Sequence, residues 1–239
     1  MKGIILSGGS GTRLYPLTKI TSKQLLPVYD KPMIFYPLQT LLDAGIKDIL
    51  IIVAPDRAGD FLRLLGSGKD FGVRFSYEIQ DKPEGIAQAY TIAETFIGDD
   101  SVCLILGDNI FEDDFSETIR NFKSGGLVFA KEVPDPERFG VIKFDESGKA
   151  VTIKEKPQEY LSSFAMTGLY VADNRVIKIA KELKPSARGE LEITDVFDWY
   201  LKQNELMVEV VEGDWIDAGT FESLRNASEL ARKKKLSKK

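Results

Sequence analysis

Three glycines and an arginine follow the first apolar run of the chain, and residues of these types at this spacing could bind phosphate. Residues 4–6 predict a buried strand, which leads into a loop that holds Gly8, Gly9 and Gly11. Glycines let backbone N–H groups turn toward an anion without a clash from a Cβ atom. Arg13 adds a fixed positive charge just past the loop. The arrangement favours a phosphate-binding loop over the structural alternative, a tight turn between a strand and a helix.

Two commoner phosphate loops are excluded by the residues that follow these glycines. The P-loop pattern G-x-x-x-x-G-K-[ST] is absent, because Arg13 and Leu14 stand where Lys and Ser or Thr would be needed. The dinucleotide pattern G-x-G-x-x-G begins at Gly9 and Gly11 but has Leu14 in place of the third glycine. Pro16 also disfavours a helix that opens in the usual way after such a loop.

Two carboxylates are candidate ligands for a cation. Asp108 follows residues 101–106, an apolar run that predicts a buried strand, and Asp217 precedes a predicted helix. Each has a structural alternative, since Asp108 could be a turn residue after Gly107 and Asp217 could form an Asx turn. As a pair they could hold Mg²⁺, which prefers a couple of carboxylates together with phosphate oxygens and water.

Four further polar residues could contact ligands. Glu155 and Lys156 end a predicted strand, where a solvated ion pair is the default, but Glu155 could bind a hydroxyl-rich ligand and Lys156 a phosphate. Gln24 and Gln80 offer amide groups that could read the edge of a pyrimidine base, although either could be purely structural. Lys23, next to Gln24, adds a second cation near the glycine loop.

Composition narrows the chemistry further. The 239-residue chain contains no histidine, so triads with histidine, Cys-His nucleophiles and His-based zinc sites are excluded. Cys103 is the only cysteine, which excludes an intrachain disulfide and fits a reducing cytoplasm. The net charge of −5 does not indicate a nucleic-acid partner, and no apolar run is long enough to span a bilayer. The basic residues 232–239 predict a frayed helix end; a weak nucleic-acid or membrane patch is the alternative.

The elements that must position these residues alternate between strands and helices in the first half of the chain. Residues 48–54, 74–80 and 101–106 predict strands, and residues 32–44 and 86–97 follow helical spacing. Pro37 must kink the first of these helices or mark its true start. This order predicts an α/β fold with a parallel sheet covered by helices on both faces. Because ligands bind beyond the carboxyl ends of such strands, the glycine loop, Gln80 and Asp108 should share one rim.

The second half is richer in strands. Strands are predicted at 126–133, 140–144, 150–154, 164–171 and 207–211, and helices at 174–183 and 194–203. A last helix begins near Thr220, a good N-cap. These patterns predict one continuous domain over 1–239, with a β-rich insertion that could cover one end of the sheet.

Six segments resemble the glucose-1-phosphate thymidylyltransferase family of sugar nucleotidyltransferases, and the resemblance covers nearly the whole chain. These segments are 3–13, 22–34, 106–109, 135–141, 155–157 and 188–195. The family implies a Rossmann-like, GT-A-like fold, with a mostly parallel sheet flanked by helices and a β-rich sugar-binding insertion. It also implies Mg²⁺, a homo-oligomer (dimer or tetramer), and transfer of dTMP from dTTP to α-D-glucose 1-phosphate. The products would be dTDP-glucose and pyrophosphate, in the first step of dTDP-sugar biosynthesis, for example of dTDP-rhamnose.

The resemblance also implies roles for individual residues. Metal binding falls to Asp108 and Asp217, and charge stabilisation during catalysis to Arg13 and Lys23. Nucleotide binding falls to Gly8, Gly9, Gly11, Thr12, Arg13, Lys23, Gln24, Gln80 and Gly85. Sugar-phosphate binding falls to Asn109, Gly140, Glu155, Lys156, Met166, Tyr170 and Arg188. Met166 stands where the family usually has valine.

The same resemblance divides the domain into a nucleotide-binding half over 1–125, a sugar-phosphate-binding half over 126–219 and a C-terminal helix over 220–239. The chain resembles a short form of the family. Longer members add a helical C-terminal tail that contributes to a regulatory site. The resemblance therefore does not imply feedback inhibition of this chain by a downstream dTDP-sugar.

The expected chemistry agrees with the absence of histidine. A phosphate monoester has a second pKa of about 6, so the sugar phosphate is mostly dianionic at neutral pH. Its oxygen can attack the α-phosphorus in line without a general base, while cations neutralise the charge that builds up. Two alternatives remain: a related uridylyltransferase that makes UDP-glucose or another sugar nucleotide, and a non-catalytic nucleotide-sugar sensor.

Overall fold

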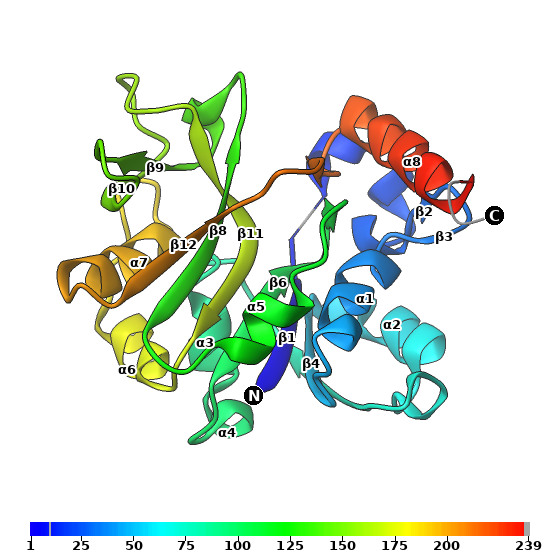
Figure 1. Ribbon diagram of the computed structural model, residues 1–239. Helices are drawn as coiled ribbons and strands as arrows, with labels where there is room; N and C mark the ends of the chain where they lie inside the picture. The colour runs from blue at the N-terminus through cyan, green and yellow to red at the C-terminus, as the bar shows by residue number, and fades with distance from the viewer. Residues whose placement is uncertain (10, 237–239) are drawn as a thin grey trace.

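A mixed nine-stranded sheet runs through the computed structural model, which describes residues 1–9 and 11–236 (Figure 1). Its parallel part consists of four strands in the order β6-β1-β4-β5. These are β1 (Lys2–Ser7), β4 (Asp48–Val53), β5 (Arg74–Ile79) and β6 (Val102–Leu106). The predicted parallel strands are therefore confirmed. They are nearly continuous apolar runs, as strands covered on both faces require.

The β-rich second half continues this sheet and does not form a separate layer over it. Strand β11 (Phe164–Ala172) pairs antiparallel with β6, and β8 (Gly126–Glu132) and then β12 (Leu206–Val210) follow beyond it. Because Leu169 pairs with Ile105, the first residues of β11 extend past the carboxyl end of β6. There they pair with β9 (Gly140–Phe144), which forms a hairpin with β10 (Ala150–Glu155). The insertion thus reaches the predicted end of the sheet as an extension of it.

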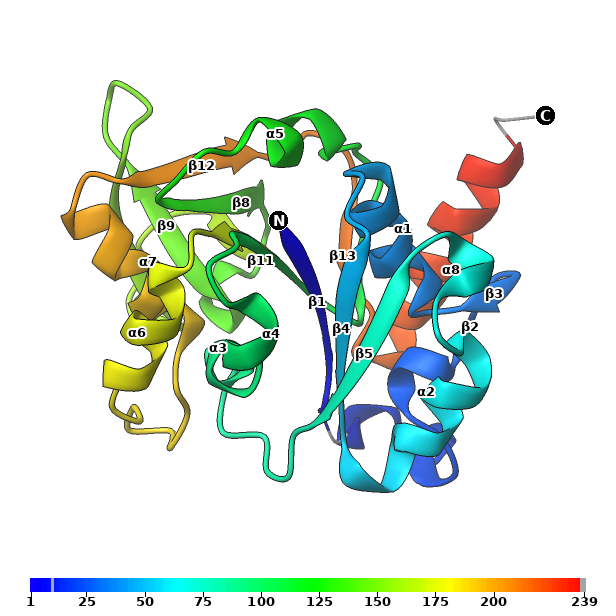
Figure 2. The same ribbon diagram turned by 90° about the horizontal axis from the view of Figure 1, so that it is seen from below.

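Helices cover both faces, as the sequence predicts. Alternate residues of β1 point to opposite faces, so Ile4 and Ile5 belong to two different apolar clusters. Figure 2 shows one set of helices on each side of β1, β4 and β5. On the Ile5 side lie α1 (Phe35–Asp43), α2 (Ala58–Leu65) and α5 (Ser116–Asn121). On the Ile4 side lie α3 (Gln88–Ile92), α4 (Glu94–Ile97), α6 (Arg175–Glu182) and α7 (Ile193–Lys202).

Two predicted helices differ from their expected bounds. The helix expected over 32–44 begins at Phe35, so Pro37 lies in its first turn, where a missing N–H leaves no intrahelical bond unmade. The helix expected over 86–97 is two short helices, because Ala93 leaves helical geometry with ψ near 6°. Tyr90 and Ile97, from the two pieces, still pack into one cluster.

The last helix, α8 (Phe221–Leu236), begins where Thr220 predicts it. The Ser223 N–H donates to Thr220 Oγ1 at 3.2 Å, and the Thr220 N–H donates to Ser223 Oγ at 3.0 Å, so each side chain caps the other's backbone. A third apolar cluster joins this helix to two short ribbons, β2 (Pro27–Val28) with β3 (Lys31–Pro32), and β7 (Asn109–Phe111) with β13 (Trp215–Asp217). No helix within the described residues is both long enough and apolar enough to cross a membrane.

Candidate functional site

A two-stranded ribbon brings the predicted carboxylates together. In the antiparallel pair of β7 and β13, Asp217 lies opposite Asn109, and the Ala218 N–H donates to the carbonyl of Asp108 at 2.9 Å. The two aspartates are distant in sequence, so this pairing explains how they come to share the rim beyond β6. Asp108 is buried and Asp217 is partly buried.

Two cations neutralise this carboxylate pair. Lys23 Nζ donates to Asp108 Oδ2, and Arg13 Nη2 lies 4.0 Å from Asp217 Oδ2. Burial alone would raise the pKa of Asp108, but the charge and hydrogen bond of Lys23 outweigh it and lower that pKa. Burial and the neighbouring Asp108 charge raise the pKa of Asp217 to about 6. Burial lowers the pKa of Lys23, but the charge and hydrogen bond of Asp108 raise it by more. The net pKa is raised, so the lysine stays charged.

The glycine loop lies directly against these cations. A Cβ atom on Gly9 would come within 3.9 Å of Lys23 Nζ, and one on Gly219 would come within 2.6 Å of Arg13 Nη2. Gly11 has φ of +63°, a left-handed conformation that favours glycine, and Thr12–Leu14 follow as one 3₁₀ turn. The loop and Asp108 therefore share one rim, as the sequence predicts, and Lys23 and Asp217 join them in one cluster. Ser10, within the same loop, lies outside the described residues.

The predicted base-reading residues, Gln24 and Gln80, are both buried near this loop. Gln24 and Gln80 are 2% and 3% exposed, so their amides need partners. Gln24 Oε1 accepts from Ser22 Oγ at 2.5 Å, and Gln80 Nε2 donates to Gln88 Oε1 at 2.7 Å. A Cβ atom on Gly8 would lie only 2.0 Å from Gln80 Oε1, so this glycine makes room for the amide.

Gly85 has a structural constraint of its own. Its φ is +114°, and a Cβ atom there would lie 2.3 Å from the carbonyl oxygen of Leu191. The Leu191 N–H donates to the Glu84 carbonyl at 2.7 Å. Glycine is therefore needed for the close approach of this segment to the loop before α7.

A cavity of about 160 Å³ adjoins Asp217 and collects most of the predicted sugar-phosphate residues. Those in its lining are Asn109, Gly140, Glu155, Lys156, Met166 and Tyr170. The lining also includes side chains that the residue-level prediction missed, among them Arg138, Phe139, Thr167 and Trp215. Arg138 and Phe139 fall inside segment 135–141, so that motif carried a signal for them. A second cavity of about 570 Å³ shares Arg138, Phe139, Trp215 and Asp217 with the first.

Hydrogen bonds fix the polar wall of the smaller cavity. Asn109 Oδ1 accepts from Trp215 Nε1 at 2.6 Å and from the Gly168 N–H at 2.9 Å. Thr167 Oγ1 is buried and has no partner within the described residues. Burial, and then the charge of Glu192, raise the pKa of Glu155, although Arg188 and Lys156 oppose this.

Arg188 is not part of this lining. Its Nη2 atom donates to Glu192 Oε2 at 2.7 Å, Glu190 Oε2 at 3.1 Å and Glu155 Oε1 at 3.3 Å. The guanidinium is thus surrounded by three carboxylates, and it contacts the cavity only through Glu155.

The aspartate pair fits a divalent cation. Within residues 1–9 and 11–236 there is no group of three or more His, Cys, Asp or Glu side chains that could hold a metal by itself. Asp217 Oδ1, however, is buried and has no hydrogen-bond partner in the described part of the chain, and Asp108 lies beside it. A buried carboxylate oxygen without a partner suits Mg²⁺, which completes its coordination with water and substrate phosphate.

A glycine loop with two cations and two carboxylates, at the carboxyl edge of a parallel sheet, is an arrangement typical of α/β enzymes that act on nucleotides. Comparisons with known proteins agree. A family model described as nucleotidyl transferase matches residues 2–234. The chain therefore belongs to the nucleotidyl transferase family and is an enzyme.

Individual relatives support the narrower resemblance. A glucose-1-phosphate thymidylyltransferase of Neisseria meningitidis is 56% identical over 95% of this chain and 81% of its own length. The enzyme of that name from Mycolicibacterium smegmatis is 54% identical over 97% of this chain and 82% of its own length. A crystal structure assigned to a Bacillus anthracis enzyme of that name, with a sucrose bound, has a TM-score of 0.91 and 51% identity, over 97% of this chain and 95% of that one. The predicted resemblance is confirmed.

A more distant neighbour shares the fold. A UDP-glucose pyrophosphorylase in complex with UDP-glucose is 25% identical, with a TM-score of 0.85, and the match covers 98% of both chains. The predicted fold class, a mostly parallel sheet flanked by helices, is confirmed by these neighbours.

Proposed function

We propose that the protein transfers dTMP from dTTP to α-D-glucose 1-phosphate and releases dTDP-glucose and pyrophosphate. The observation that carries the proposal is the cluster of Lys23, Arg13, Asp108 and Asp217 around the glycine loop. Two cations and a carboxylate pair beside a glycine loop suit a metal-bound polyphosphate, and this supports the proposal. Relatives at 51–56% identity bear the name of this activity, which favours it over a sensor that binds without turnover.

The proposed roles follow the two groups of residues around the cluster. Gly8, Gly9, Gly11, Thr12, Arg13 and Lys23 would bind the triphosphate, and Gln24, Gln80 and Gly85 the thymine and ribose. The cavity beside Asp217 would hold the sugar phosphate, with Glu155 on hydroxyl groups and Lys156 on the phosphate. Arg188 would act through Glu155, because three carboxylates surround it. Residues 1–125 would form the nucleotide half and 126–219 the sugar-phosphate half. Of the predicted C-terminal helix over 220–239, α8 forms Phe221–Leu236, and residues 237–239 lie outside the described residues.

Asp108 and Asp217 would hold Mg²⁺, which when bound would offset the negative charge of the phosphate oxygens. The residues of the chain supply the rest of the positive charge. Arg13, with a side chain 55% exposed, is free to meet a phosphate at the mouth of the site. Lys23 would share its ammonium between Asp108 and the α-phosphate. Both cations would stabilise the departing pyrophosphate more than the bound reactants, and this difference accelerates the reaction.

The bonding changes need no proton acceptor. An oxygen of the sugar phosphate dianion forms a bond to the α-phosphorus, and the bond from that phosphorus to the bridging oxygen breaks. The electron pair leaves with pyrophosphate. The task of the protein is to bring two polyanions into line, which explains a site built from cations and amides without histidine.

Substrate choice tests the proposal directly. Pyrophosphate release would be measured with dTTP, UTP, CTP, ATP and GTP, each paired with several sugar 1-phosphates. We expect turnover to be fastest with dTTP and glucose 1-phosphate, and to stop when EDTA removes divalent metal and return with Mg²⁺. Thymine differs from uracil by one methyl group, worth roughly 1–3 kcal/mol, so UTP should be a weaker second substrate. Faster turnover with UTP would instead favour a uridylyltransferase, which the fold of the UDP-glucose pyrophosphorylase also accommodates.

We also propose that the enzyme acts in the cytoplasm as a homo-oligomer, in the first step of a dTDP-sugar pathway such as that of dTDP-rhamnose. Sedimentation of the purified protein would give the oligomeric state.

A further inference from the structure

A chain of hydrogen bonds behind Gln80 fixes the direction in which its amide points. Gln80 Nε2 donates to Gln88 Oε1 at 2.7 Å, and the Glu84 N–H donates to the same oxygen at 3.1 Å. Gln88 Nε2 in turn donates to Glu84 Oε2 at 2.9 Å. Gln88 comes from the first turn of α3, and Gln80 follows the last residue of β5.

Two groups of Glu84 set the direction of these hydrogen bonds. A backbone N–H can only donate and a carboxylate can only accept. Gln88 must therefore turn its oxygen toward the Glu84 N–H and its nitrogen toward the Glu84 carboxylate. With the Gln88 oxygen held in place, only the nitrogen of the Gln80 amide can face it, so the Gln80 oxygen faces the other way.

That oxygen points at the glycine loop. It lies 2.0 Å from where a Cβ atom on Gly8 would be, and Gln80 is only 3% exposed. Gln80 thus presents a hydrogen-bond acceptor, and not a donor, beside the loop. Because Gln80 uses its nitrogen to donate to Gln88, its oxygen is the group that can accept a hydrogen bond from a ligand, and a ligand that donates to it is favoured.

We propose that Gln88 and Glu84 are positioning residues that make Gln80 select the imide edge of thymine or uracil and reject cytosine. The inference rests on the proposed function, in which Gln80 meets the base. Thymine and uracil carry a hydrogen on N3 and can donate it to Gln80 Oε1. Cytosine carries a lone pair at that atom, and two acceptors would then face each other. Neither Gln88 nor Glu84 needs to touch the nucleotide.

Replacing Gln88 tests the proposal through a ratio of substrates. In Gln88→Met the side-chain amide is lost, with both its oxygen and its nitrogen, and the Gln80 amide is free to turn its nitrogen to the base. We expect the ratio of kcat/KM for dTTP to that for dCTP to fall roughly 10- to 100-fold, mainly through KM, with UTP following dTTP. In Gln88→Lys the new group only donates, so Gln80 would turn its oxygen toward the lysine and its nitrogen toward the base. The kcat/KM for dCTP should then rise above its wild-type value.

A polarity-preserving double variant provides the rescue. Gln88→Glu combined with Glu84→Gln keeps an acceptor for Gln80 Nε2 and for the backbone N–H of residue 84, and exchanges donor and acceptor only between the side chains of residues 84 and 88. We expect this variant to regain the wild-type ratio. Gln39→Met is the matched control, since Gln39 also donates to a carboxylate four residues away, Asp43, on a helix outside the site.

The outcomes separate the inference from the proposed function. A wild-type ratio in Gln88→Met, or equal losses for dTTP and dCTP with no rescue by the double variant, would overturn the positioning role. A wild-type enzyme that does not prefer dTTP or UTP over dCTP would overturn the proposed function itself. Thermal unfolding of each variant, compared with Gln39→Met, shows that a lost ratio does not come from a lost fold.

Discussion

Lys23 and Arg13 differ in a way that matters for their roles. Lys23 is largely buried against Asp108, so it serves the fold as well as the chemistry, whereas the Arg13 side chain is 55% exposed and lies 4.0 Å from Asp217. A buried ion pair is strongly destabilised when one partner alone is removed, because the other charge is left uncompensated. Substitutions of the two cations should therefore differ in their effect on thermal stability, although both lower kcat.

Arg13→Ala is expected to lower kcat roughly 10²–10³-fold with little change in the sugar-phosphate KM or in thermal stability. Lys23→Ala is expected to lower kcat to a similar degree and also to destabilise the protein, because Asp108 loses its counter-charge. Initial rates and thermal unfolding measure the two effects. Lys19→Ala removes an exposed lysine from the neighbouring turn and serves as the control. Near-normal turnover in both Arg13→Ala and Lys23→Ala would contradict the mechanism.

Thr167 combines a cost in stability with a candidate function. Its buried hydroxyl has no hydrogen-bond partner among the residues that the structure describes, and it lines the cavity beside Asp217. Thr167→Val removes the unsatisfied group, so the free energy of unfolding should stay level or rise by about 1 kcal/mol. The KM for glucose 1-phosphate should rise roughly tenfold if the hydroxyl bonds the sugar. Denaturant unfolding and saturation kinetics test this together, and a less stable variant with an unchanged KM would count against it.

The sequence predicts which residue types gather at the site better than it predicts their contacts. Glu155 and Lys156 belong to segment 155–157, which carries a recognisable motif, and both line the cavity. Arg188 also lies in a recognisable motif, segment 188–195, yet three carboxylates surround it and it does not line the cavity. Two of these carboxylates are local and the third comes from β10, so no spacing along the chain could indicate that arrangement.

Short elements do as much as long ones to build the site. β7 and β13 have only three residues each, too few for any periodic pattern, so the ribbon that brings the two predicted aspartates together could not be predicted. The longer parallel strands were predictable because each is a continuous apolar run. The break at Ala93 between α3 and α4 carries no glycine or proline signal.

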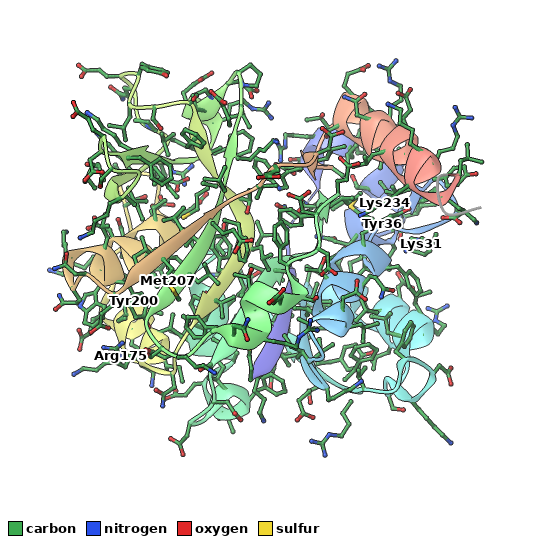
Figure 3. All side chains as sticks on the ribbon, in the orientation of Figure 1. Lys31, Tyr36, Arg175, Tyr200, Met207 and Lys234 are labelled. Atoms are coloured by element: carbon green, nitrogen blue, oxygen red, sulfur yellow. The ribbon has the colours of Figure 1, made fainter. Side chains whose placement is uncertain are left out.

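Asp173 holds four elements together at the far end of the sheet. It accepts from the Gly125 N–H at 2.7 Å, from Tyr200 Oη at 3.0 Å and from Arg175 Nη2 at 2.7 Å. Arg175 and Tyr200 lie next to each other on α6 and α7, with the guanidinium carbon 5.6 Å from the ring centre (Figure 3). Burial opposes ionisation of Asp173, but these donors outweigh it and lower its pKa.

Asp173→Asn should therefore lower the free energy of unfolding by about 1–3 kcal/mol at pH 7. A carboxyl group with a lowered pKa in the folded state stabilises the protein above its unfolded pKa of about 3.9, and that contribution is lost as the pH falls through the folded value. Urea unfolding between pH 3 and 7 should show the wild-type advantage shrinking below about pH 4. Asp60→Asn, which removes a surface pair with Arg63 at 3.0 Å, should change little. A pH-independent difference between Asp173→Asn and wild type would argue against the charge.

At the scale of the whole molecule, the described residues form three apolar clusters, and the smallest supports the site. Two large clusters cover the faces of the sheet, while the third contains Val28, Met33, Ile110, Ala218 and the buried face of α8. Ile110 and Ala218 adjoin the ribbon that pairs Asn109 with Asp217. The helix therefore braces the carboxylate pair from outside the main sheet, as Figure 1 shows for α8 above β2. Sequence patterns predicted the helix and its cap, but not which ribbon it would cover.

Leu230→Ala tests this bracing. Leu230 is 7% exposed in the third cluster, and removal of a buried leucine side chain costs about 2–5 kcal/mol where the site cannot collapse. Because the cluster is separate from the two large ones, we expect the loss to appear first as local opening of α8 and β13. Hydrogen exchange should accelerate there while β1 and β4 stay protected, and kcat should fall because Asp217 is no longer held beside Asp108. Leu236→Ala, at a position 54% exposed on the same helix, should leave exchange and turnover at wild-type values. Uniformly faster exchange across the whole sheet in Leu230→Ala would show instead that α8 unfolds only with the rest of the molecule, and that the site has no independent brace.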